Sequence, residues 1–141
     1  MNMDNVERFG VSMPKELVKA FDETIKRKGY TNRSEAIRDL ARAMIVEDSW
    51  DDDDDVVLGV VTLVYDHHTT DLGANLAGMQ HDHHNIVLCS QHVHVDHHNC
   101  LETIILKGKA SNVQVMADRL IATKGVKHGR LTKTTTGDSL H

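Results

Sequence analysis

The first residues of the chain alternate between apolar and polar side chains. Residues 8–13 follow a period of two, and this pattern predicts a half-buried strand. One face of that strand would carry Phe9, Val11 and Met13. The other face would carry Arg8, Gly10 and Ser12.

Two helices are predicted after the strand. Pro14 stands where a first helical residue belongs, and Lys28-Gly29 closes the element. Asn32 can cap a second helix, with Glu35 completing a capping-box pattern. A lone strand has two open edges and cannot pair with itself, so this strand-helix-helix unit needs a second copy.

The rest of the chain predicts a different architecture. A β-branched run at 56–65 indicates a strand, and residues 70–83 can form a helix. Two strands are predicted at 86–95 and 101–106, followed by an amphipathic helix at 113–121 and a last strand at 126–134. This βαββαβ order is the ferredoxin-like split unit, and the whole chain is predicted to be α+β. The helices would cover one face of the sheet and leave the other for a partner.

Charge separates the two regions. Residues 1–47 carry a net charge of +1, residues 48–55 carry −6, and residues 56–141 are neutral. A run of like charges repels itself and offers nothing to bury, so it reads as a hydrated linker. We therefore predict a unit at 1–47 with a short N-terminal arm, an acidic linker at 48–55 and a second unit at 56–141.

Composition excludes several classes of protein. No segment approaches the ~18–20 apolar residues of a membrane span, and the N-terminus lacks the apolar stretch of a signal peptide, so a soluble, cytoplasmic protein is expected. With only two cysteines, a disulfide framework is disfavoured. Five aromatic residues cannot build large cores, and oligomerisation is expected to supply the missing burial.

The residues with metal-binding chemistry gather on one predicted hairpin. His92 and His94 share one face of a strand, and Cys100 opens the next strand beside them. Thiolate and imidazole favour nickel, copper, zinc or cobalt over magnesium or calcium. A fourth donor can come from the end of the preceding helix, which carries His81, His83 and His84.

Strand parity makes a second prediction about this hairpin. Val93 and Val95 should point to the helix-covered side, and Cys89 would share their face as a small core residue. The other histidines are expected to be surface residues. These are His67, His68, His97, His98 and His128.

Other functions remain open at this point. A zinc ion with an open position beside Glu102 could activate water in a hydrolase, but no Gly-rich phosphate loop, helical zinc-protease motif or nucleophile elbow is present. A zinc- or copper-binding regulator and a metal sensor that does not bind DNA also fit the donor set. A small-molecule regulator would leave the histidine and cysteine hairpin without a role. A binding protein is favoured over an enzyme.

The N-terminal pattern resembles the ribbon-helix-helix family of DNA-binding repressors. The run from Asn32 to Arg38 resembles one branch of that family. The resemblance implies that a two-stranded ribbon enters the major groove and that the start of the second helix holds a phosphate. The residues that it assigns to DNA binding are Arg8, Gly10, Ser12, Asn32, Arg33 and Ser34.

Residues 8–131 together resemble the NikR family of nickel-responsive repressors. Beyond the helix opening, the motifs that carry this match are Gln80 to His84, His92-Val93-His94, Cys100-Leu101-Glu102, Leu106-Lys107-Gly108 and Gly125 to Gly129. The resemblance implies a C-terminal ACT-type domain, a homotetramer built as a dimer of dimers, and a palindromic double-stranded DNA operator.

The same resemblance implies one Ni²⁺ per subunit. The ion would lie in a near-planar site formed by His92, His94 and Cys100 of one subunit and His81 of another. Tyr65, Gln80 and Glu102 match residues that support the ligands through hydrogen bonds.

Strand parity supports a shared site as well, since the helix carrying His81 should cover the sheet face opposite the hairpin donors. Where members of the family usually have a hydroxyl residue on the ribbon, this chain has Gly10. At Thr69-Thr70 it lacks the basic residues with which some members help to hold DNA.

Overall fold

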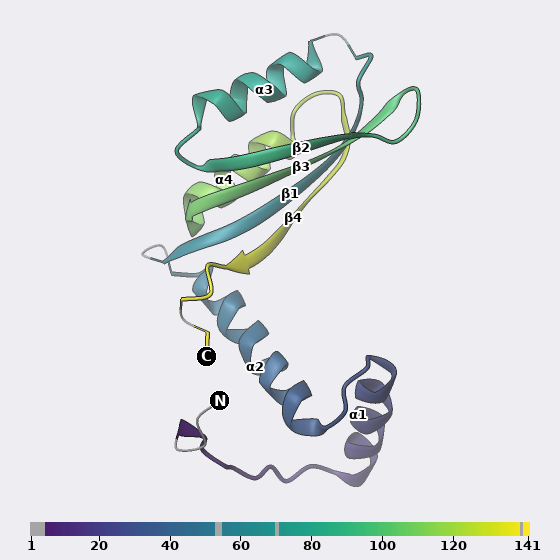
Figure 1. Cartoon of the computed structure of the whole chain (residues 1–141), viewed down its shortest axis with the longest axis vertical. Coiled ribbons are helices and arrows are strands. Elements are labelled where there is room, and N and C mark those ends of the chain that lie inside the picture. The colour runs from purple at the N-terminus through teal and green to yellow at the C-terminus, as the bar shows by residue number, and fades with distance from the viewer. Residues whose placement is uncertain (1–4, 53–54, 70, 139) are drawn as a thin grey trace. The chain divides into compact units, whose positions relative to one another are not determined.

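A computed structural model describes residues 5–52, 55–69, 71–138 and 140–141. The chain forms two compact units, Met1–Ala41 and Arg42–His141. Figure 1 shows the elements in order: α1 (Lys15–Arg27), α2 (Arg33–Ser49), β1 (Val56–Asp66), α3 (Leu72–Asp82), β2 (Val87–His94), β3 (Asn99–Lys109), α4 (Ala110–Ile121) and β4 (Val126–Thr135). None of the described helices is both long and apolar enough to cross a membrane.

The boundaries of α1 follow the proline and glycine signals. Pro14 precedes the helix by one residue, and its carbonyl oxygen accepts the amide of Val18 at 3.0 Å. The chain leaves the helix at Gly29, where φ is +90°, a backbone conformation that costs glycine little because it has no Cβ. The predicted first helix is confirmed, with Pro14 at the capping position.

Asn32 caps α2 as predicted. Its Oδ1 accepts the backbone amide of Glu35 at 2.9 Å. The Glu35 carboxylate accepts the hydroxyl of Thr31 at 3.1 Å. The cap is therefore confirmed, but in the described residues Glu35 bonds the residue before the cap, a different reciprocal bond from that of a capping box.

The predicted strand at residues 8–13 does not form in the single chain. Among the described residues the sheet consists of β1 to β4, and Phe9 and Val11 are 75% and 62% exposed. The prediction of a half-buried strand is wrong for one chain, because residues 5–41, the described part of the N-terminal unit, contain no second strand to complete a ladder. Residues 6–14 instead run as a segment without regular structure (Figure 1).

The C-terminal unit has the predicted βαββαβ order. Its antiparallel sheet has the strand order β2-β3-β1-β4. β1 pairs with β3 without interruption, from Val56 opposite Lys109 to Asp66 opposite Asn99. The α+β fold with a ferredoxin-like second domain is confirmed.

One face of this sheet carries the core. The buried side chains of β1 and β3 are the alternate residues of each strand, and they pack with both helices. Leu72 and Leu76 come from α3, and Val113, Met116 and Leu120 come from α4. Both helices therefore cover the same face.

The start of the predicted linker is structured. Residues 48 and 49 form the end of α2, so the linker prediction is wrong for these two residues. Trp50 then packs against the core, where its Nε1 donates to the carbonyl of Thr134 at 2.9 Å. The partly buried indole thus ties the start of the acidic run to the core. Asp51, Asp52 and Asp55 are exposed, and residues 53 and 54 lie outside the described part of the chain.

Candidate metal centre and nucleic-acid surface

The hairpin of β2 and β3 holds the metal-binding side chains on the buried face of the sheet. His92 lies opposite Glu102, and His94 lies opposite Cys100. Directly opposed residues in a ladder share a face. Cys100 is fully buried and Glu102 is 7% exposed, so all four residues lie on the helix-covered face.

This arrangement overturns the predicted orientation of the strand. Val93 and Val95 are 44% and 62% exposed, on the side away from the helices. Cys89 is exposed as well, because it has the parity of Val93 and lies opposite Ile105. Parity correctly separated the two sets of residues, but a single strand cannot show which set faces the helices.

His67 joins the site, although the sequence pattern assigned it to the surface. Among the described residues, His67, His94 and Cys100 form a group whose ligand atoms all lie within 4.8 Å of one another. The Cys100 Sγ lies 3.2 Å from the His67 Nδ1 and 3.6 Å from the His94 Nδ1. The missed signal was parity on β1, because His67 is two residues beyond Tyr65, which faces the core.

Two of the four predicted ligands lie outside this compact group. The ring of His92 is next to it, with its centroid 5.1 Å from that of His94. His81 is exposed in the last turn of α3. His84 is also exposed, whereas the Nδ1 of His83 contacts the carbonyl of Met79 at 2.9 Å.

The electrostatics of the group fit a transition-metal ion. Burial raises the pKa of the Cys100 thiol, and nearby carboxylates, led by Asp66, raise it further. Burial, followed by the neighbouring His68 and His94, lowers the pKa of His67. At neutral pH the group therefore offers the neutral imidazole of His67 and a thiol that a bound cation would deprotonate.

Glu102 joins the site to two other elements. Its Oε2 accepts the hydroxyl of Tyr65 at 3.0 Å, and its Oε1 accepts the amide of Gln80 at 2.9 Å. Burial, and then the bond to Glu102, raises the pKa of Tyr65, so the hydroxyl remains a donor. Because Gln80 reaches Glu102 from α3, this helix lies on the same face as the hairpin donors. The geometric reason given for a site shared between chains is therefore wrong.

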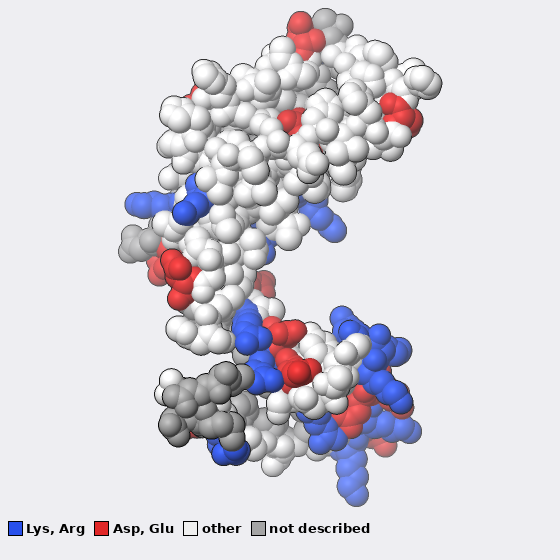
Figure 2. Space-filling view, viewed as in Figure 1, with Lys and Arg blue, Asp and Glu red and all other residues white. Residues whose placement is uncertain are grey.

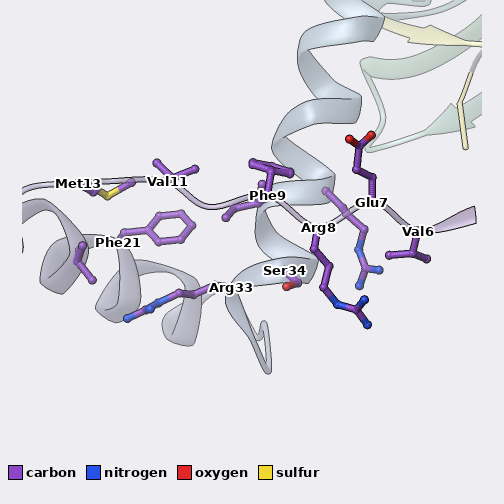
Figure 3. A pocket seen from close by; sticks show the side chains of 12 residues that line it. Val6, Glu7, Arg8, Phe9, Val11, Met13, Phe21, Arg33 and Ser34 are labelled. Atoms are coloured by element: carbon purple, nitrogen blue, oxygen red, sulfur yellow. The ribbon is translucent and has the colours of Figure 1, made fainter. Parts of the chain in front are cut away.

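The N-terminal unit contains an apolar hollow of about 600 Å³. Figure 3 shows the segment at residues 6–14, hereafter called the arm, above α1, with the ring of Phe21 below Val11 and with Phe9 farther along the arm. Arg8 and Glu7 extend to opposite sides of the arm (Figure 3). The hollow is thus lined by the apolar face of the predicted strand.

The remaining predicted DNA-binding residues surround this hollow or lie close to it. Arg33 is held by Asp22 through two bonds of 2.8 and 2.7 Å, and the bond to Arg33 lowers the pKa of that carboxyl. Ser34 lines the hollow, Ser12 is exposed, and open space surrounds Gly10. Lysine and arginine side chains gather densely on the N-terminal unit in Figure 2.

Comparison with known proteins places both units. Residues 7–47 match the ribbon-helix-helix protein model of the copG family, and residues 58–134 match the C-terminal nickel-binding domain of NikR. A nickel-responsive regulator of Geobacter sulfurreducens is 54% identical over 99% of this chain and all of its own length. Similarly described proteins of Nitratidesulfovibrio vulgaris and Solibacter usitatus are 51% and 52% identical, over 98% and 96% of this chain and 99% and 97% of their own lengths.

Proposed function

Because this chain belongs to the NikR family of nickel-responsive regulators, we propose that it is a homotetrameric repressor of nickel-uptake or nickel-related genes. It binds a palindromic operator in double-stranded DNA when nickel fills one site per subunit. The observation that carries this proposal is the hairpin that holds His94 opposite Cys100, with Glu102 buried beside them. A repressor with a DNA partner works in the cytoplasm.

The proposed ligands are His92, His94 and Cys100 of one subunit and His81 of a neighbour. Three of them share one face of one hairpin, and thiolate and imidazole suit Ni²⁺. His81 is exposed at the end of α3 and is accessible to another subunit. Nickel, when bound, supplies the link between two subunits.

We propose that His67 holds the Cys100 thiol in place when no metal is bound. The neutral imidazole lies 3.2 Å from the Cys100 Sγ and accepts its hydrogen bond. His67 thereby holds the thiol toward His94 before metal arrives. Glu102 keeps the supporting Tyr65 and Gln80 in place throughout.

In the N-terminal unit, the arm of a second copy fills the apolar hollow. Pairing of two arms satisfies their open backbone groups and covers side chains such as Phe9. Arg8 and Ser12 then read base edges, while Gly10 contributes no side chain. The beginning of α2, at Asn32, Arg33 and Ser34, holds a backbone phosphate.

Nickel binding is coupled to DNA binding through the ordering of the tetramer. Without metal, the two DNA-binding pairs sample many orientations, so docking on both half-sites costs entropy. A neighbour's hairpin that captures His81 orders α3 and raises the population that can bind DNA.

A mixing experiment tests whether the site is shared. His81→Ala and Cys100→Ala tetramers should each bind nickel weakly, because each lacks a ligand at every site. Unfolded and refolded together, some facing pairs combine an intact hairpin with an intact His81, and tight binding should partly return. If the mixture binds no better than its parents, although subunit exchange is confirmed by mass, the site lies within one chain.

A DNA titration tests the other half of the proposal. Nickel should strengthen binding to the operator, and Arg8→Ala should cost about 1–3 kcal/mol there if Arg8 reads a guanine. An equal loss on operator and random DNA would make Arg8 a phosphate contact.

A further inference from the structure

Lys127 occupies an irregular position in β4. β1 pairs with β4 through Val64 opposite His128 and Tyr65 opposite Val126, which leaves Lys127 as the extra residue of a bulge. Bulges redirect side chains that regular pleating would send elsewhere. The Lys127 Nζ donates to the Asn99 Oδ1 at 2.7 Å.

This bond spans three strands. Asn99 is the first residue of β3 and lies opposite Asp66, the last residue of β1. Since β1 lies between β3 and β4, the Lys127 side chain crosses the end of β1 to reach Asn99. The residue that it holds is the immediate neighbour of Cys100.

Asn99 in turn forms hydrogen bonds with the turn between β2 and β3. Its Nδ2 donates to the Asp96 Oδ2 at 3.1 Å. The Asp96 Oδ1 accepts the backbone amides of His98 at 2.8 Å and Asn99 at 2.7 Å. These amide bonds lower the pKa of Asp96 to about 2, so the carboxylate is charged at neutral pH.

Apolar packing does not explain how this turn is held. Val95, Asp96, His97 and His98 are all exposed. The turn nevertheless joins His94 to Cys100, whose imidazole and thiol must keep a fixed separation to bind one ion. Hydrogen bonds hold the turn instead. Those of Asp96 and Asn99 lie within it, while the His67 amide donates to the His98 carbonyl at 3.0 Å and the His68 Nε2 contacts the His97 carbonyl at 2.8 Å from outside it. The bonds of Asp96 and Asn99 are the ones that connect the turn to Lys127.

We propose that Lys127, Asn99 and Asp96 are positioning residues of the metal centre. Lys127 anchors Asn99 to β4, Asn99 orients Asp96, and Asp96 closes the turn so that His94 and Cys100 face each other. This inference rests on the proposed nickel site, and it adds three residues that bind no metal themselves.

The test uses the full-length protein and nickel alone. Lys127→Met should weaken nickel binding by about 10- to 100-fold in a competition titration, the usual cost of losing a support residue. It should also shift the thiolate-to-nickel absorption band, which a change in global stability alone would not move. Lys127→Arg retains a donor and should recover most of the affinity.

Lys124→Met is the matched control. It removes the same charge three residues away, and the affinity should stay within about twofold, since exposed charges are screened. Asn99→Ala provides a second route, with the same loss expected. The double variant Lys127→Met/Asn99→Ala should bind no worse than Asn99→Ala, because both changes break one chain of bonds.

Each outcome separates this inference from the function on which it depends. If the wild-type protein binds no nickel, the proposed function fails. If it binds nickel and Lys127→Met or Asn99→Ala matches it in affinity and absorption band, the positioning role is wrong. Equal losses in Lys127→Met and Lys124→Met would also overturn it, as an effect of net charge.

Discussion

The two units differ in how much of their own structure one chain can stabilise. Among its described residues, the C-terminal unit buries fourteen side chains in one contiguous core. The N-terminal unit buries only Ile25 and Ala36 among its described residues, and it leaves Phe9, Val11 and Leu17 more than half exposed. Apolar burial is the main driving force of folding. The C-terminal unit therefore has a core of its own within one chain, whereas the N-terminal unit needs a second copy to bury its apolar side chains.

The candidate sites follow the same division. A thiol and two imidazoles meet within one copy of the C-terminal unit. The predicted DNA-reading face depends on a strand that one chain cannot form. Four predictions test this contrast, from the largest expected effect to the smallest.

Phe9→Asp should abolish operator binding and leave nickel binding near the wild-type level. Burial of one Phe side chain contributes about 1.5–3 kcal/mol, and each pair of arms loses two such side chains. The substitution also places a charge in the interface between the arms. Nickel titration and DNA binding on the same sample measure the two units separately. Phe9→Leu keeps an apolar side chain and should retain DNA binding. Wild-type affinity for DNA in Phe9→Asp would show that the arm is not an assembly surface.

Leu63→Ala should destabilise the C-terminal unit by about 2–5 kcal/mol, because it leaves a cavity in a core with little room to collapse. Denaturant unfolding of the metal-free protein measures this cost. Leu63→Met conserves volume and should cost less than about 1.5 kcal/mol. A cost below about 0.5 kcal/mol for the alanine variant, the range of surface changes, would mean that this core is not close-packed.

The same substitution at two glycines should have unequal costs. A Cβ at Gly59 would lie 2.9 Å from the Cγ1 of Val113 and 3.0 Å from the Cδ1 of Leu131, so Gly59→Ala should cost about 1–3 kcal/mol. At Gly10 nothing lies within 4 Å, and Gly10→Ala should stay within about 0.5 kcal/mol. Thermal unfolding of both variants decides the matter, and equal shifts would contradict the contrast.

Asn32→Ala should cost about 1 kcal/mol in the N-terminal unit, since it removes the bond to the Glu35 amide. Circular dichroism during denaturation would report the loss of helix stability, with nickel affinity as the internal reference. Asn32→Asp keeps a capping oxygen and should behave like the wild type. If nickel affinity falls together with helix stability, the two units are not independent in this respect.

Apart from the strand predicted at residues 8–13, which the single chain does not form, the sequence was sufficient for the elements and their order. Helical periodicity predicted α1 and α2, Asn32 predicted the cap, and alternating or β-branched runs predicted four strands. It also brought His94 and Cys100 together, because a short turn between two strands places their ends side by side. These features depend on residues near one another in the chain, where local geometry decides the outcome.

Tertiary structure decided the features that depend on distant segments. Only strand pairing showed that Cys100 faces the core and Cys89 does not, since parity is silent about which side the helices cover. Only the placement of β1 beside β3 brought His67 to the thiol, and only the bulge in β4 sent Lys127 to Asn99. Both of these contacts, His67 with Cys100 and Lys127 with Asn99, join residues about thirty positions apart in the sequence. A periodic pattern of side chains carries no information over that separation.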